Sequence, residues 1–292
     1  MKKAAICANP IKDSDFQLTL TTAALLKKYG ADVSVCMPPL HPDMYKLPPS
    51  LSVIPMEIAL HNADFMVCLG GDGTILHASK DASELNVPIV GINLGQRGFM
   101  AEIEPYDLEP LKKVVSGEYE IETRMMLDVS VTRDEHTIYA STALNDAVVS
   151  KGAVQRIIDM SVYADGHRIL DFSGDGVVVS TPTGSTAYSM SAGGPIIEPE
   201  AENIVVTPVC AHSLYVKPYV LTPGRTVSVI VGELIGKSAY LSTDGDEPVE
   251  LMCGDKVEVS RSNRTVHLIR VTSKSFYENI SEKLNRPRGE TR

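Results

Sequence analysis

The sequence lacks any long apolar run. No stretch approaches the ~18 consecutive apolar residues of a membrane-spanning helix, so we expect no membrane association. The apolar stretch at the N-terminus stops at Asn9-Pro10, which is short for the core of a signal peptide. These two absences favour a cytoplasmic protein.

Cysteine and positive charge are also scarce. The five cysteines are odd in number and form no Cys-x-x-Cys pair, which indicates neither a disulfide framework nor a zinc site. Acidic residues number 37 against 27 lysines and arginines, and the net charge of −10 argues against general nucleic-acid binding. The one locally basic stretch, near the C-terminus, is interrupted by apolar and acidic residues and is typical of a solvated surface.

Strand and helix patterns alternate in the first part of the chain. We expect strands at 4–8, 32–36, 65–69 and 88–92, and helices from Ser14 to Gly30, near 55–62 and at 74–83. Strands separated by helices favour a parallel sheet, which binds ligands at the carboxyl ends of its strands. The sequence therefore predicts a Rossmann-like α/β domain over residues 1–120.

The pattern changes to short alternating runs after residue 120. Asp165-Gly166 separates two such runs and predicts a hairpin turn. Further strands are expected at 177–180, 204–206, 227–231, 239–242, 249–252, 257–260 and 266–271, and the one clear helix candidate spans 186–192. We expect an antiparallel β-rich domain over residues 121–264.

A glycine-rich loop, Gly70-Gly71-Asp72-Gly73-Thr74, follows the apolar strand at 65–69. Glycines let backbone N–H groups approach a phosphate closely, and a helix that starts after them adds its positive end. Asp72 would repel that anion unless the carboxylate holds a hydroxyl or a metal. The loop indicates phosphoryl transfer, although Asp and Gly also form ordinary turns.

A block of hydroxyl groups and glycines occupies residues 181–191. Eight of its eleven residues are Ser, Thr, Tyr or Gly, which supply hydrogen-bond donors suited to phosphate and ribose oxygens. A capped helix entry, rich in turn-forming residues, is the alternative.

Other candidate residues carry weaker signals. Asn145-Asp146 could bind ribose hydroxyls or form a turn, Arg156 could pair with a phosphate or lie on the surface, and His77 lies one helical turn beyond the glycine loop. The segment 232–238 resembles a P-loop but is one residue too short, and 91–98 resembles a dinucleotide fingerprint with the wrong spacing.

Three of these segments together resemble the NAD kinase family. They are Gly70-Gly71-Asp72-Gly73-Thr74, Leu144-Asn145-Asp146-Ala147, and the stretch from Asp175 through Thr181-Pro182-Thr183-Gly184-Ser185-Thr186-Ala187-Tyr188-Ser189 to Gly193-Gly194-Pro195. The first is shared with diacylglycerol, sphingosine and 6-phosphofructo-kinases, whereas the last is far more discriminating. The resemblance covers most of the chain.

The resemblance implies transfer of the γ-phosphate of ATP to the 2′-hydroxyl of the adenosine ribose of NAD, giving NADP, with Mg²⁺ or Mn²⁺ as a divalent cofactor. Asp72 would be the catalytic carboxylate, and Gly70, Gly71, Gly73 and Thr74 would form the ATP phosphate loop. The implied NAD-binding residues are Asp72, Gly73, His77, Asn145, Asp146, Arg156, Asp175, Thr186, Ala187, Tyr188, Ser189 and Ser191. The family also implies a homodimer or homotetramer and a C-terminal segment, about 265–292, that packs on the first domain.

The chain departs from the family pattern at a few points. It has Cys210-Ala211-His212 and Lys217-Pro218 where Cys-Pro-His and Arg-Pro are frequent, and Asp246 where glutamine is frequent. It also has no P-loop lysine, so we expect the backbone of residues 70–74, the metal and Arg97 to hold the donor phosphates. Two rival functions are a non-catalytic NAD(P) sensor and a lipid or sugar kinase that shares the glycine loop.

Overall fold

The computed structural model describes residues 1–38, 46–95, 98–153, 156–272 and 275–284. The chain divides into two compact units. Unit 1 comprises residues 1–123 together with 266–292, and unit 2 comprises residues 124–265.

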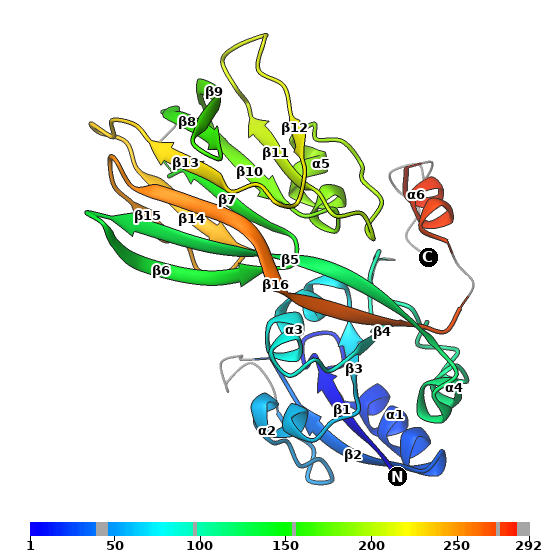
Figure 1. Ribbon diagram of the computed structural model, residues 1–292. Helices are drawn as coiled ribbons and strands as arrows, with labels where there is room; N and C mark the ends of the chain where they lie inside the picture. Colours follow the sequence, from blue (N-terminus) through cyan, green and yellow to red (C-terminus); the bar gives the residue numbers. More distant parts are fainter. Residues whose placement is uncertain (39–45, 96–97, 154–155, 273–274, 285–292) are drawn as a thin grey trace. The chain divides into compact units, whose positions relative to one another are not determined.

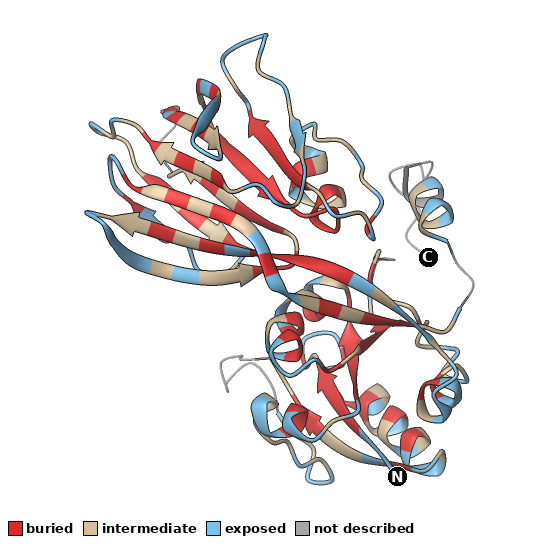
Figure 2. Ribbon diagram, in the orientation of Figure 1, coloured by how far each residue is buried: buried red, intermediate tan, exposed pale blue. Residues whose placement is uncertain are grey.

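A parallel sheet forms the centre of unit 1 (Figure 1). Its strands lie in the order β2-β1-β3-β4, and the end of a fifth strand, β16, pairs with β4 in parallel at Leu268. Their bounds are β1 Lys2–Ala8, β2 Ala31–Cys36, β3 Phe65–Gly70 and β4 Ile89–Asn93. Strands β3 and β4 are buried along their whole length (Figure 2). This burial is typical of a parallel sheet, because helices cover both of its faces.

The helices of unit 1 begin and end close to the expected residues, with one correction. They are α1 Gln17–Lys28, α2 Met56–His61, α3 Asp72–Glu84, α4 Leu111–Ser116 and α6 Phe276–Leu284. Helix α1 does not start at Ser14, because the carboxylate of Asp13 accepts hydrogen bonds from the backbone N–H groups of Leu18 and Thr19 and so satisfies the first turn. Helices α4 and α6 were not predicted.

Unit 2 consists of antiparallel strands (Figure 1). Their buried side chains form one apolar cluster. One set of strands pairs in the order β12-β11-β10-β7-β14-β15, and in the other β8 pairs with β9 and β13, while β16 pairs with β13 and β5 pairs with β6. The bounds are β5 Glu120–Arg133, β6 His136–Ala143, β7 Asp146–Lys151, β8 Ile158–Ala164, β9 His167–Gly174, β10 Gly176–Ser180, β11 Ile204–Val209, β12 Tyr219–Leu221, β13 Val227–Val231, β14 Ala239–Thr243, β15 Val249–Leu251 and β16 Lys256–Arg270. The expected combination of a parallel α/β part and an antiparallel β part is confirmed.

Two local expectations for this region were wrong. The runs at 257–260 and 266–271 belong to one long strand, β16, which leads the chain back into unit 1. The expected helix at 186–192 is instead a 3₁₀ turn, η2 Gly184–Thr186, followed by the single-turn helix α5 Tyr188–Ser191. The hairpin at Asp165-Gly166 is confirmed, with both residues at positive φ between β8 and β9.

None of the helices in the described ranges combines the length and the apolarity that crossing a bilayer requires.

Candidate active site

The glycine loop lies at the carboxyl end of β3, where it turns directly into α3. Gly71 is the residue before the helix, and Asp72 rather than Thr74 is the first helical residue. Gly70 has no room for a Cβ because the side chain of Thr74 fills that space, and the Thr74 hydroxyl accepts a 2.9 Å hydrogen bond from the amide of Asn9. The positive end of the helix and the carboxylate of Asp72 are therefore placed together.

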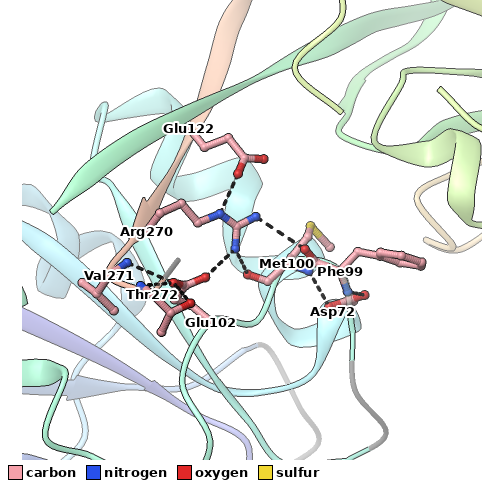
Figure 3. A network of polar contacts seen from close by, with 8 residues as sticks. All are labelled: Asp72, Phe99, Met100, Glu102, Glu122, Arg270, Val271 and Thr272. Atoms are coloured by element: carbon pink, nitrogen blue, oxygen red, sulfur yellow. Dashed lines mark hydrogen bonds and ion pairs between the residues drawn. The ribbon is translucent and has the colours of Figure 1, made fainter. Parts of the chain in front are cut away.

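The carboxylate of Asp72 has a fixed orientation (Figure 3). It accepts hydrogen bonds from the backbone N–H groups of Phe99, at 2.7 Å, and Met100, at 3.0 Å. A Cβ on Gly98 would overlap with this carboxylate, so that position needs glycine for the contact to form. The segment that follows β4 thus forms one wall of the loop.

Arg270, the last residue of β16, supports the same segment from the other side (Figure 3). Its guanidinium pairs with Glu122 at 2.6 Å and with Glu102 at 3.0 Å, and it donates to the carbonyl oxygens of Met100 and Phe99 at 3.3 and 3.4 Å. Burial lowers the pKa of Arg270, but the two carboxylates outweigh this effect and raise it above its usual value. The guanidinium remains charged and holds the wall in place.

In unit 2, the carboxylate of Asp244 organises the loop that contains Asn145 and Asp146. It accepts hydrogen bonds from the backbone N–H groups of Leu144, Asn145 and Asp146, at 2.7, 2.8 and 3.0 Å. A charged acceptor that satisfies three donors holds a loop tightly. The position of Asn145 therefore depends on a residue about a hundred positions later in the chain.

The hydroxyl block packs directly on that loop. The hydroxyl of Thr181 donates to the carbonyl of Leu144 at 2.6 Å and accepts from the backbone N–H of Gly184 at 3.0 Å. A Cβ on Gly184 would collide with the carbonyl of Asn145. The block and the Asn145 loop thus form one rigid site within unit 2.

Two side chains of this site have shifted pKa values. Burial, and then the negative charge of Asp244, raise the pKa of Asp146 from 3.8 to about 7. Burial, followed by the charges of Cys210, Asp175 and Asp146, raises the pKa of the Tyr188 hydroxyl. Asp146 therefore changes protonation state near neutral pH, while Tyr188 remains a neutral hydrogen-bonding group.

The remaining candidate residues lie in different environments. Asp175 pairs with Lys151 at 2.7 Å, and the hydroxyl of Thr186 donates to the carbonyl of Thr183. Ser189 is fully buried, and its hydroxyl is bonded to that of Thr207, so a different group of this residue would have to contact a ligand. Three of the other candidates, Ser191, Arg156 and His77, are exposed, and Ala187 is half-buried. Arg97 lies outside the described residues.

Comparison with known proteins identifies the family. Residues 51–119 match the family model of the ATP-NAD kinase N-terminal domain. Residues 144–271 match the family model of the ATP-NAD kinase C-terminal domain. A NAD kinase of Acetivibrio thermocellus is 36% identical over 285 residues, which is 97% of this chain and 97% of that protein. A NAD kinase of Moorella thermoacetica is 43% identical over 223 residues, 76% of this chain and 71% of that protein.

The chain belongs to the NAD kinase family. Solved structures of this family have the same fold: yeast NADH kinase complexed with NADH superimposes with a TM-score of 0.83 at 26% identity, covering 100% of this chain and 89% of that one. An NAD kinase from Archaeoglobus fulgidus in complex with ATP gives 0.71 at 26% identity, covering 97% and 98%.

Sequence reasoning missed the residues that hold the NAD kinase motifs in place. Gly98, Arg270 and Asp244 each act through contacts with residues that are distant in the chain. Asp244 begins an Asp-Gly pair, which forms a turn with both residues at positive φ. Its second task was not visible in the local pattern.

Proposed function

We propose that this chain transfers the γ-phosphate of ATP to the 2′-hydroxyl of the adenosine ribose of NAD. The 2′-oxygen forms a bond to the γ-phosphorus, the bond to the β–γ bridging oxygen breaks, and ADP leaves as NADP forms. The observation that carries the proposal is the oriented Asp72 carboxylate at the start of α3, in a chain that aligns with a NAD kinase over 97% of its length.

Asp72 acts by alignment more than by basicity. A ribose hydroxyl is much less acidic than a carboxylic acid, and phosphoryl transfer has a loose transition state that needs little prior deprotonation of the nucleophile. The carboxylate orients the hydroxyl in line with the γ-phosphate and accepts its proton late. Alignment of this kind contributes several kcal/mol to lowering a barrier. The two backbone N–H donors fix the carboxylate for that task.

The dinucleotide is bound by the residues gathered in unit 2. Asn145 and Asp146 supply the polar groups of the loop, and the hydroxyl block supplies Thr186, Ala187, Tyr188 and Ser191 along η2 and α5. Tyr188 is 44% exposed, so its ring is available to contact a base or a ribose. Asp175 serves the nicotinamide end, as the family resemblance implies, and binding there has to accommodate its ion pair with Lys151.

A divalent cation, Mg²⁺ or Mn²⁺, accompanies the nucleotide in this proposal. No three His, Cys, Asp or Glu side chains in the described part of the chain converge on a possible metal position. Mg²⁺ commonly binds through one or two carboxylates together with substrate phosphates, so an ion that arrives with ATP does not need a preformed cluster of three side chains. When bound, such an ion neutralises the charge that develops on the transferring phosphate.

A cytoplasmic location and assembly as a homodimer or homotetramer are further parts of the proposal. The location rests on the absence of a long apolar run in the sequence, and the assembly rests on the family resemblance. Size-exclusion chromatography with light scattering tests the assembly.

The experiment that tests the function is a coupled assay. The purified protein is incubated with NAD, ATP and Mg²⁺, and NADP is followed with an NADP-specific dehydrogenase. NADP formation supports the kinase. Binding of NAD in a thermal-shift assay without NADP formation would support the sensor, and absence of NAD binding would favour a lipid or sugar kinase. NADH is the second acceptor to offer, because the yeast neighbour was solved with it.

A further inference from the structure

The ammonium group of Lys12 lies against the glycine loop. A Cβ built on Gly71 would stand 2.9 Å from Nζ of Lys12, and a Cβ built on Gly95 would stand 3.1 Å from the same atom. Any side chain at Gly71 would therefore displace the ammonium group, and one at Gly95 would crowd it. The absence of side chains at both positions leaves room for a cation between the two loops.

The position of Lys12 follows from the strand order. Lys12 comes just after β1, Gly71 just after β3 and Gly95 just after β4, and these three strands are neighbours in the parallel sheet. Their carboxyl ends meet at one edge, which is where sheets of this kind bind ligands. The chain thus brings a lysine to the edge that carries Asp72.

Asn9 fixes the turn that carries Lys12. Its carbonyl accepts hydrogen bonds from the backbone N–H groups of Lys12 and Asp13, at 3.1 and 2.9 Å, and its side-chain oxygen accepts from Ile11 at 3.1 Å. Its amide nitrogen donates to the hydroxyl of Thr74. The Lys12 turn and the glycine loop are therefore joined through one side chain.

The charge of Lys12 is available to a ligand. The adjacent acid, Asp13, directs its carboxylate to α1, where it binds the backbone and the hydroxyl of Thr19 at 2.8 and 2.6 Å. The carboxylate of Asp72 is bound by Phe99 and Met100. Within the described ranges no carboxylate lies at ion-pair distance from Lys12, whose side chain is exposed.

One further polar group at this edge points to a ligand. Asn93, the last residue of β4, is only 7% exposed, and its side-chain oxygen has no hydrogen-bond partner among the described residues. A buried polar atom without a partner is costly, and a ligand donor or a bridging water would satisfy it.

We propose that Lys12 binds the polyphosphate tail of the phosphate donor. The ammonium group supplies the point charge that the lysine of a P-loop supplies in other nucleotide-binding proteins, but from the turn after β1. This inference rests on the proposed function, because it concerns the donor of the same reaction. It adds Lys12 to the backbone of residues 70–74, the metal and Arg97, which the sequence analysis expected to hold the donor phosphates.

The test compares Lys12→Met with Lys3→Met. Lys3 is an exposed lysine near the amino end of β1, the strand that precedes the Lys12 turn. Lys3→Met is the matched control because it removes the same charge far from the glycine loop. Steady-state KM values for ATP and for NAD are measured for each variant, together with the inhibition constant of inorganic triphosphate, the simplest probe of a polyphosphate site.

Lys12→Met is expected to raise both the KM for ATP and the inhibition constant of triphosphate by about tenfold, the usual effect of losing a charge-assisted hydrogen bond. The KM for NAD should stay within about twofold, and Lys3→Met should match the wild type. Lys12→Arg, which keeps the charge, should recover most of the affinity for triphosphate, because phosphate accepts hydrogen bonds from a guanidinium as well.

Equal constants for the wild type and Lys12→Met would overturn the proposal, as would a parallel rise in the KM values for ATP and NAD. Failure of the wild type to form NADP would instead overturn the proposed function. Triphosphate binding, followed by calorimetry, still tests the lysine in that case, since it requires no turnover.

Discussion

Asp72 accepts a 2.7 Å hydrogen bond from the backbone N–H of Phe99, 27 residues later in the chain. This contact joins the loop after β3 to the segment after β4, and Arg270, from the returning strand β16, holds the carbonyl groups of that segment. The orientation of the proposed catalytic carboxylate therefore depends on three separate parts of the chain.

Gly98→Ala should lower kcat strongly and leave NAD binding almost unchanged. The added methyl group would overlap with the carboxylate of Asp72 and turn it away from its two N–H donors. Gly224→Ala is the control, because a Cβ there meets no atom within 4 Å. Steady-state kinetics with NAD and ATP provide the measurement. A kcat within twofold of the wild type for Gly98→Ala would show that the orientation of Asp72 does not matter.

Arg270→Gln should destabilise unit 1 by about 2–3 kcal/mol, since it leaves the largely buried Glu102 and Glu122 without their cation. Arg168→Gln, which breaks the exposed pair with Asp171, should cost at most about 1 kcal/mol. Urea unfolding monitored by circular dichroism compares the two. Similar losses in both variants would mean that the buried network contributes no more than a surface pair.

The raised pKa of Asp146 predicts a pH-dependent stability. Between the pKa of about 4 in the unfolded chain and about 7 in the folded one, the folded state retains a proton that the unfolded state has released. The free energy of unfolding should therefore fall as pH rises through this window and stay low above pH 7.

Asp146→Asn should remove this dependence, because the amide resembles the protonated acid and cannot ionise. The melting temperature of the variant should equal that of the wild type below about pH 4 and exceed it at pH 8, while exposed Asp171→Asn should track the wild type at both. Identical pH profiles for wild type and Asp146→Asn would show that folding does not shift the pKa of this carboxyl.

Gly184→Ala should weaken NAD binding by at least about tenfold and change the KM for ATP little. Its methyl group would collide with the carbonyl of Asn145 and separate the hydroxyl block from the Asn145 loop. Dissociation constants for NAD, measured by calorimetry, test this, again with Gly224→Ala as the control. Unchanged NAD affinity would exclude the packed arrangement of the two segments as the dinucleotide site.

The elements with strong local patterns were predictable from the sequence. The strand at 65–69 and the hairpin at Asp165-Gly166 were correctly located because apolar runs and turn residues mark them directly. The start of α1 was misplaced because two capping acceptors, Ser14 and Asp13, stand side by side, and only the fold decides that Asp13 is used. The apolar pattern is interrupted between residues 260 and 266, so the sequence predicted two short strands where β16 is one continuous strand.

The candidate site was only half predictable, for a related reason. Asp72 and the hydroxyl block are recognisable because their residues are consecutive. Arg270, Gly98 and Lys12 take part only through the parallel sheet, which brings distant strand ends to one edge, and a single sequence carries no signal of that proximity. The raised pKa of Asp146 likewise depends on its burial and then on Asp244, about a hundred residues away.

The most direct test of the account is NADP formation by Asp72→Asn. The amide oxygen can accept from only one of the two N–H groups of Phe99 and Met100, and the residue can no longer take up a proton from the ribose hydroxyl. We expect a folded protein that binds NAD within about threefold of the wild type and loses about 10²- to 10⁴-fold in turnover, the usual contribution of a positioned proton acceptor. Turnover equal to that of the wild type would contradict the assignment of Asp72 as the catalytic carboxylate.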